Sequence, residues 1–201
     1  MGGISQQSEL LLARICHDLS APIGAMGMVA STLSGDPEAF RILSESQQRL
    51  VARLKLFRLL SIDTDACPEF SFEKVKDVLT ECCLCEKVTF LTRDLSGVLE
   101  TPRIKFLISA AAILLPALVR GGHMVFEAQE GEGRLCCSGQ GGRIYLQEEV
   151  ISWFSGTKTP SSQTIFCSLI ESFAQACGGS VRLVQTSEKA TLFLDTKTEV
   201  L

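Results

Sequence analysis

The sequence has few histidines and no strong excess of charge of either sign. Only 2 of its 201 residues are histidine, and the formal net charge is −4 at pH 7. A chain without an excess of basic residues has no general attraction for nucleic acid or for an anionic membrane surface. With 46% hydrophobic and 21% charged residues, the composition indicates a soluble globular protein and excludes a disordered one.

Long apolar segments are also absent. The longest apolar run extends from Phe106 to Val119 and contains Ser109 and Pro116. It is shorter than the roughly 20 residues that a membrane-spanning helix needs, so it indicates a buried helix. The N-terminus has no basic stretch leading into an apolar one, and no signal peptide is therefore expected. These features predict a cytoplasmic protein without a membrane partner.

Cysteine is abundant, but its spacing favours neither a metal site nor a disulfide framework. Cys82 and Cys85 have CxxC spacing, but the sequence has no second such pair and no cysteine at ligand spacing from a histidine, and the cysteine count of 9 is odd. We expect reduced thiols that pack as small apolar side chains, and no metal site. The cysteines are Cys16, Cys67, Cys82, Cys83, Cys85, Cys136, Cys137, Cys167 and Cys177.

The first third of the chain predicts a helical hairpin. Apolar residues recur three and four apart from Leu12 to Leu33, as on one face of a helix. Gly35 can end this helix, while Asp36 and Pro37 are typical of the start of the next, which extends to about Leu60. Because such a hairpin cannot bury two apolar faces by itself, we expect a homodimer in which two hairpins form a four-helix bundle.

The rest of the chain predicts a mixed α/β domain. Residues 61–68 have the composition of a linker, so we expect a helical hairpin over 1–64 and an α/β domain over 65–201. The overall fold class is then α+β, with antiparallel strands and helices on one face in a two-layer sandwich. Helices are expected over 72–85, 101–120 and 164–177, and strands over 87–92, 124–129, 134–138, 143–147, 180–185 and 190–196.

His17 is the strongest candidate for chemistry. At about 100° per residue, it lies opposite the apolar face of its helix and projects into water. An exposed imidazole next to the carboxylate of Asp18 suits a nucleophile that accepts and returns a phosphoryl group. Pro22 has no N–H, so the carbonyl of Asp18 loses its helical partner and the helix is expected to bend there, unless Pro22 simply packs in the apolar face. His123, which has no such neighbours, is expected to be structural.

The run His17-Asp18-Leu19-Ser20-Ala21-Pro22-Ile23 resembles the phosphoacceptor motif of the sensor histidine kinases, which is His-Asp/Glu-hydrophobic-x-x-Pro-hydrophobic. The segment from Leu169 to Val181 resembles the last helix and strand of the ATP-binding domain of that family, and Thr191-Leu192-Phe193-Leu194 resembles its final strand. The resemblance covers nearly the whole chain. It implies a dimerising phosphoacceptor hairpin followed by an ATPase-like α/β domain.

The sequence departs from the kinases in three parts of the nucleotide site. The kinases contact adenine with the aspartate of an Asp-x-Gly-x-Gly loop, but the corresponding stretch here is Cys137-Ser138-Gly139-Gln140-Gly141, which keeps Gly139 and Gly141 and replaces the carboxylate with Cys137. Residues 108–119 contain no Asn, Asp or Glu to hold Mg²⁺. Residues 156–163 contain one glycine and a proline, a poor backbone cradle for phosphates. We therefore expect that ATP is not used.

A histidine hairpin joined to an ATPase-like domain without ATP resembles the dedicated histidine phosphotransferases of bacterial phosphorelays, of the ChpT type. Their Cys-His-Asp-Leu-x-x-Pro-x-Gly-Ala motif is matched from Cys16 to Ala25. This resemblance implies that His17 takes a phosphoryl group from the receiver-domain aspartate of a hybrid histidine kinase and passes it to the aspartate of a response regulator. Asp18 would fix the imidazole tautomer, unless it is simply an exposed helix charge. Mg²⁺ would come with the receiver domain, and this chain would bind no cofactor.

The same resemblance implies a surface that contacts the receiver domains. Ser20, Ala21 and Gly24 are small and follow the histidine, so a receiver helix could approach closely. Arg14 is also expected on this surface. Arg53, nearly level with His17 on the second helix, is expected either to contact the acidic partner or to lie in solvent. Two other functions stay open: a divergent sensor histidine kinase that still binds ATP, and a non-catalytic module that docks receivers.

Overall fold

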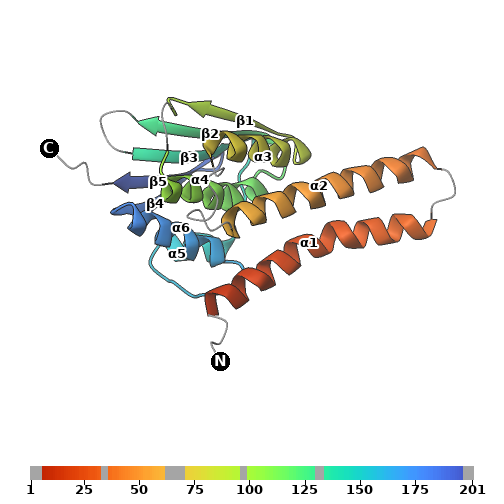
Figure 1. The fold of residues 1–201 in the computed structure, drawn as a ribbon, viewed down its shortest axis with the longest axis horizontal. Coiled ribbons are helices and arrows are strands. Elements are labelled where there is room, and N and C mark those ends of the chain that lie inside the picture. The colour runs from red at the N-terminus through yellow and green to blue at the C-terminus, as the bar shows by residue number, and fades with distance from the viewer. Residues whose placement is uncertain (1–5, 33–35, 62–70, 96–98, 130–133, 197–201) are drawn as a thin grey trace.

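The computed structural model describes residues 6–32, 36–61, 71–95, 99–129 and 134–196. They form a long helical hairpin attached to an α/β domain (Figure 1). Within these ranges, no helix has the length and apolar character needed to cross a membrane. The predicted domain boundary between residues 64 and 65 and the predicted linker, apart from Ser61, lie outside the described residues.

The hairpin consists of helices α1 (Gln6–Thr32) and α2 (Pro37–Ser61). The break between them follows the local sequence. The Asp36 carboxylate accepts a hydrogen bond of 3.0 Å from the N–H of Glu38, and Pro37 occupies the first helical position, where its missing N–H costs nothing. The predicted hairpin is thus present, and Figure 1 shows its closed end pointing away from the α/β domain.

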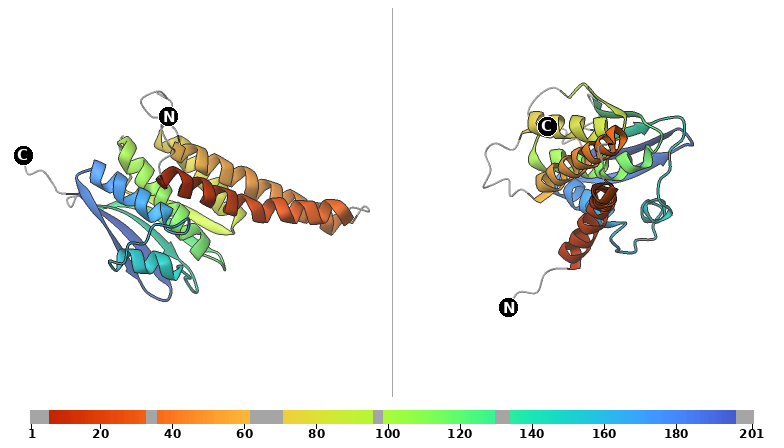
Figure 2. Two further views of the ribbon diagram at one scale, coloured as in Figure 1. Left: turned by 90° about the horizontal axis from the view of Figure 1, so that it is seen from below. Right: turned by 90° about the vertical axis from the view of Figure 1, so that its right-hand side faces the viewer.

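The α/β domain contains one five-stranded sheet with the strand order β1-β2-β3-β5-β4. Strands β2, β3, β5 and β4 pair antiparallel, whereas β1 and β2 are parallel. The helices α4 and α6 lie together against one face of this sheet, and the seven-residue α5 lies near α6 (Figure 2). The strands are β1 (Val88–Arg93), β2 (Gly122–Gln129), β3 (Arg134–Gln140), β4 (Gly179–Gln185) and β5 (Lys189–Thr196), and the helices are α3 (Phe72–Cys85), α4 (Thr101–Leu114), α5 (Glu148–Phe154) and α6 (Ile165–Ala176), with a 3₁₀ turn at Leu115–Ala117.

The predicted α+β class and two-layer arrangement are confirmed, but four details of the prediction were wrong. The sheet is mixed, because the crossover through α4 brings β2 alongside β1 in parallel. The helix expected over 101–120 ends at Leu114, since Pro116 cannot continue it. Residues 143–147 form no strand, because the N–H groups of Ile144 and Tyr145 bind carbonyls in two separate segments. Helix α5 was not predicted at all.

The base of the hairpin is built into the core of the α/β domain. On α2, Ala52, Leu56 and Phe57 are buried together with the apolar side chains of α3, α4 and α6. The Phe57 ring stacks on that of Phe166 from α6, with centroids 6.3 Å apart and an interplanar angle of 8°. Because α1 contacts both α2 and α6, this packing also holds α1, which carries His17, next to the α/β domain.

Candidate functional site

His17 lies on the solvent side of α1, where helical periodicity places it. Its side chain is 79% exposed, and its Nδ1 lies 3.2 Å from Oδ1 of Asp18. An ionised carboxylate can only accept a hydrogen bond, so this contact favours the tautomer in which Nδ1 carries the proton. The other ring nitrogen, Nε2, then keeps its lone pair available for attack on an electrophile.

The second oxygen of the Asp18 carboxylate is bound by a buried arginine. Arg14, one helical turn before Asp18, donates from Nε to Oδ2 at 2.9 Å, and its side chain is only 9% exposed. The Arg14 guanidinium also lies 5.7 Å from the centroid of the Phe166 ring on α6. Sequence reasoning placed Arg14 on the receiver-contacting surface, whereas the structure makes it a partner of Asp18.

The carbonyl of Asp18 has a partner that the sequence did not predict. Pro22 lies four residues further along α1 and has no N–H to donate to it. Arg53 of α2 fills this position, because its Nη1 donates to the Asp18 carbonyl oxygen at 2.8 Å. Its Nη2 donates to Oε1 of Glu86, just beyond α3, at 3.2 Å. Arg53 is therefore neither free in solvent nor directed only at a partner.

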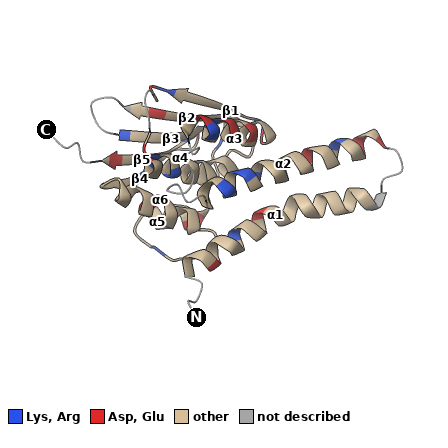
Figure 3. Cartoon of the chain, in the orientation of Figure 1, with Lys and Arg blue, Asp and Glu red and all other residues tan. Residues whose placement is uncertain are grey.

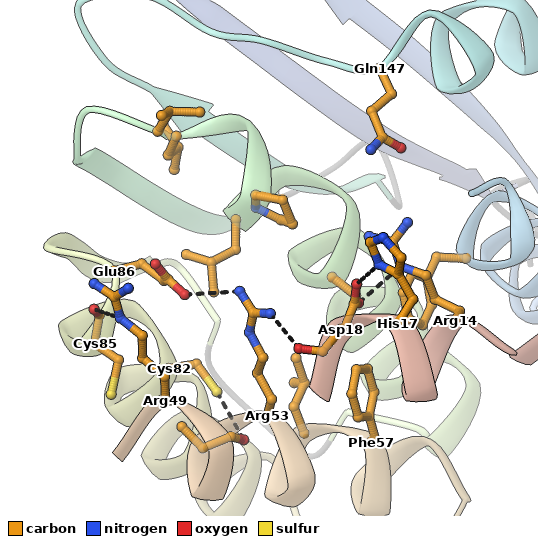
Figure 4. Close-up of a pocket in the computed structure, with 18 residues that line it drawn as sticks. Arg14, His17, Asp18, Arg49, Arg53, Phe57, Cys82, Cys85, Glu86 and Gln147 are labelled. Atoms are coloured by element: carbon orange, nitrogen blue, oxygen red, sulfur yellow. Dashed lines mark hydrogen bonds and ion pairs between the residues drawn. The ribbon is translucent and has the colours of Figure 1, made fainter. Parts of the chain in front are cut away.

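These side chains border a cavity of about 360 Å³ between the hairpin and the α/β domain (Figure 4). In the close-up, His17 and Arg14 lie together at one side, Arg53 points between Asp18 and Glu86, and Gln147 extends from the residue that precedes α5. The lining contains both charged and apolar side chains. It consists of Arg14, His17, Asp18, Arg49, Ala52, Arg53, Leu56, Phe57, Cys82, Cys85, Glu86, Ala112, Leu115, Pro116, Leu118, Val119, Gln147 and Phe166.

The small residues that follow the histidine lie on the outside of α1 rather than in this lining. Ser20, Ala21 and Gly24 are exposed, and a side chain added at Gly24 would meet nothing within 4 Å. The Ser20 hydroxyl donates to the carbonyl of Cys16 at 2.7 Å, which turns it back onto its own helix. Pro22 is buried. The turn after His17 therefore offers a low surface with little side-chain bulk.

Charge is distributed unevenly along the hairpin. Apart from Arg41 near the closed end of the hairpin, the basic side chains of α2 lie toward the junction with the α/β domain, whereas the distal half of α1 carries none among the described residues (Figure 3). At the junction, Arg49 donates to the carbonyl of Cys85 at 3.3 Å, and Lys55 forms an ion pair of 2.7 Å with Glu81 on α3. Several polar contacts thus join α2 to α3 beside the segment of α1 that carries His17.

The stretch that corresponds to the adenine loop of the kinases is packed with apolar side chains. Cys137 on β3 is fully buried, and desolvation raises its pKa well above the ordinary value. A side chain at Gly139 would lie 3.6 Å from Leu118 and 3.7 Å from Leu114, and one at Gly141 would lie 2.9 Å from the backbone oxygen of Gly121. The space above these glycines is therefore occupied by the end of α4 and the segment that follows it.

The cysteines beside the cavity are poor nucleophiles. Burial raises the pKa of Cys82 to about 12, and its thiol donates to the carbonyl of Ala52 at 3.3 Å. Burial also raises the pKa of Cys85. Both are thiols at neutral pH, and the thiolate is the reactive form. Within the described part of the chain, no three His, Cys, Asp or Glu side chains are grouped as metal ligands.

Sequence reasoning missed most of the supporting residues. The Arg14 and Asp18 spacing of four was a visible signal, since such positions are neighbours on a helix. Tertiary packing brings Glu86 to the site from the end of α3, Arg49 from α2 and Phe166 from α6, and no local pattern in the sequence marks them.

Comparison with known proteins places the chain in a family. Residues 86–189, just over half of the 201-residue chain, match the family model for the histidine phosphotransferase C-terminal domain. The protein phosphotransferase ChpT of Brucella abortus (strain 2308) is 25% identical over 153 aligned residues, and the match covers 73% of this chain and 73% of that protein. A solved structure of a bacterial phosphotransferase superimposes with a TM-score of 0.77 at 21% identity, covering 96% of this chain and 98% of the other. The protein therefore belongs to the histidine phosphotransferase family, as a phosphorelay protein of the ChpT type.

Proposed function

We propose that this protein carries phosphoryl groups between receiver domains on His17. The group would come from the phosphoaspartate of a hybrid histidine kinase and pass to the aspartate of a response regulator, without any use of ATP. The observation that carries the proposal is the state of His17: its ring is 79% exposed on a helix, and Nδ1 is held by a carboxylate that is itself held by a buried arginine.

The geometry supports a transfer that needs no proton movement. With the Nδ1 proton shared with Asp18, the Nε2 lone pair attacks the phosphorus of the acyl phosphate. The new P–N bond forms as the P–O bond breaks, and the receiver aspartate leaves as a carboxylate. Asp18 stabilises the positive charge that develops on the ring. The second transfer runs in the opposite sense, with a regulator aspartate attacking the phosphohistidine. Mg²⁺ belongs to the acidic pocket of the receiver, where it neutralises phosphoryl charge.

The packing above Gly139 supports a function without ATP. The space next to Gly139 is filled by Leu114 and Leu118, whose side chains are 0% and 2% exposed, so it is not open to a nucleotide base. The aspartate that the kinases use there is replaced by Cys137, a thiol that burial keeps protonated. A neutral thiol is a weak hydrogen-bond acceptor for the adenine amino group.

Exposed apolar side chains on the hairpin support a dimer. Several large apolar side chains of α1 and α2 are unburied in the single chain, which is unusual for so many on one hairpin. In a homodimer, two hairpins would bury them in a four-helix bundle and present one His17 from each protomer. These side chains are Leu12, Ile23, Met28, Phe40, Val51 and Leu54, with exposures between 38% and 76%.

A radiolabel transfer assay tests this function. The purified protein is given labelled ATP alone or a labelled phosphorylated receiver domain, in parallel with His17→Ala and with His123→Ala as the matched control. We expect label from the receiver alone, lost in His17→Ala and retained in His123→Ala. Label taken from ATP would instead show a kinase. Receiver binding without any label would show a docking module.

A further inference from the structure

We infer that Arg53 is a positioning residue for the phosphoacceptor turn: its guanidinium replaces the backbone N–H that Pro22 removes from α1. This inference rests on the proposed function of His17. It assigns to Arg53 a role within its own chain, because its Nη1 already donates to the Asp18 carbonyl at 2.8 Å and its Nη2 to Glu86 at 3.2 Å.

The Asp18 carbonyl needs a donor. In a regular helix, the N–H of residue 22 would bind it, but proline has none, and its ring also crowds that carbonyl. A carbonyl without a partner in a partly buried position is costly, and the chain can satisfy it only from another element. Arg53 lies on α2, 35 residues further along the chain, and contributes a charged donor, which makes a stronger hydrogen bond than an amide does.

An arginine suits this place because it holds two acceptors at once. Its planar guanidinium carries N–H groups in a rigid fork, so one nitrogen can bind the carbonyl while another binds Glu86. Glu86 is fixed in turn, since its backbone N–H caps α3 by binding the carbonyls of Cys83 and Leu84. The position of the turn after His17 is thereby tied to the end of α3, a part of the α/β domain.

The consequence for chemistry runs through Asp18. Arg14 holds the side chain of Asp18 and Arg53 holds its carbonyl, so the residue is fixed at both ends. The Oδ1 atom that contacts His17 Nδ1 is then fixed as well. Removing Arg53 frees the backbone of the turn, and the imidazole loses part of the orientation that directs Nε2 outward.

The test compares two phosphoryl donors. Phosphoramidate is a small donor that makes no protein contacts, whereas a phosphorylated receiver domain covers the surface around His17. If Arg53 positions the turn, Arg53→Met lowers the rate of His17 labelling by about tenfold with either phosphoryl donor. The rate for Arg53→Lys, which keeps one nitrogen that can donate a hydrogen bond, then lies between those of Arg53→Met and the unaltered protein. If Arg53 instead contacts the partner, only the receiver reaction slows, and the inference is wrong.

Two further variants separate positioning from general stability. Lys55→Met removes the neighbouring ion pair of the same kind, between α2 and Glu81 on α3, without touching Asp18, and should leave both rates unchanged. Pro22→Ala restores the amide N–H of residue 22. In that background, Arg53→Met should cost no more than about twofold. An equal loss from Arg53→Met in both backgrounds, or an equal loss from Lys55→Met, would overturn the inference.

Each outcome is distinguishable from failure of the proposed function. If the unaltered protein takes no label at His17 from either donor, the phosphotransfer proposal itself fails. If it takes label and Arg53→Met does so equally fast, only the role of Arg53 fails. Melting temperatures are recorded for every variant, and if Arg53→Met does not fold, Arg53→Lys and the double variant with Pro22→Ala provide the same comparison.

Discussion

Replacing Asp18 with asparagine is expected to reverse the tautomer of His17. The amide has one oxygen and one NH₂ group, whereas the carboxylate has two acceptors. Arg14 Nε, 2.9 Å from Oδ2, can only donate and therefore binds the amide oxygen. The NH₂ group then faces His17 Nδ1 and donates to it, which favours the tautomer with the proton on Nε2. That nitrogen loses the lone pair that attacks phosphorus.

The magnitude follows from the contact that is lost. A hydrogen bond to a charged group contributes about 1.5–3 kcal/mol, and each ~1.4 kcal/mol is a tenfold change in rate. Because the His17 ring is 79% exposed, solvent replaces part of this contribution, and the energy lost should lie near the lower end of that range. We therefore expect the rate of His17 labelling to fall by about tenfold to thirtyfold. Arg14 keeps a hydrogen bond to the amide oxygen, so folding should be weakened by only about 1 kcal/mol.

Two measurements check this prediction. Nitrogen-15 chemical shifts of the imidazole report the tautomer directly, and with two histidines in the chain, His123→Ala assigns the signals. The rate of His17 labelling by phosphoramidate reports the nucleophile. Asp18→Asn should move the His17 signals to the Nε2–H pattern and slow labelling together.

A second substitution, Arg14→Met, tests whether Arg14 orients the side chain at position 18. When Arg14→Met is added to Asp18→Asn, the amide is free to turn and present its oxygen to Nδ1, so part of the lost rate should return. A wild-type rate in Asp18→Asn, or an unchanged tautomer, would refute the assignment of Asp18. A further loss of rate in the double variant would refute the role given to Arg14.

Three other substitutions or reactions test the packing. Leu118→Ala removes a side chain that is 2% exposed, and the free energy of unfolding in urea should fall by about 2–5 kcal/mol; an unchanged midpoint would mean that the side chain is not packed as described. Gly122→Ala should cost about 4 kcal/mol or more, because a Cβ there would lie 2.2 Å from a backbone oxygen, whereas Gly178→Ala, with open space around it, should cost about 1 kcal/mol; equal melting temperatures would contradict this. At about pH 8, iodoacetamide should modify the exposed Cys16 and spare Cys82, whose pKa burial raises to about 12; equal alkylation by mass spectrometry would contradict the burial.

The parts of the fold that were predictable are those encoded by neighbouring residues. The hairpin could be predicted because Gly35, Asp36 and Pro37 interrupt two periodic apolar patterns. The shorter elements were harder. Residues 143–147 contain the run Ile144-Tyr145-Leu146, whose residue types are typical of a strand. The N–H groups of Ile144 and Tyr145, however, bind carbonyls in distant segments, and only the tertiary structure decides which carbonyls these are. Helix α5 has seven residues, too few to show a helical period.

The same distinction holds at the site. His17, Asp18 and Pro22 are neighbours along one helix. The exposure of His17 and its contact with Asp18 therefore follow from helical geometry, and the missing N–H follows from the proline at position 22. The contacts of Arg53 could not be predicted, because they depend on how α2 packs against α1 and α3. Arg14 lies between these cases. Its spacing from Asp18 was visible in the sequence, but its burial against Phe166 was not.

The joint between hairpin and α/β domain has a consequence for the order of events in a relay. Ring stacking of Phe57 on Phe166 and the hydrogen bonds of Arg53 hold His17 at one angle to the domain beside it. In a relay that runs through His17, donor and acceptor proteins then compete for the same binding site on a protomer. The donor has to dissociate before the acceptor can bind, so the rate of the relay depends on rapid dissociation of each complex. A complex that is too long-lived therefore slows the relay, as does one that does not form.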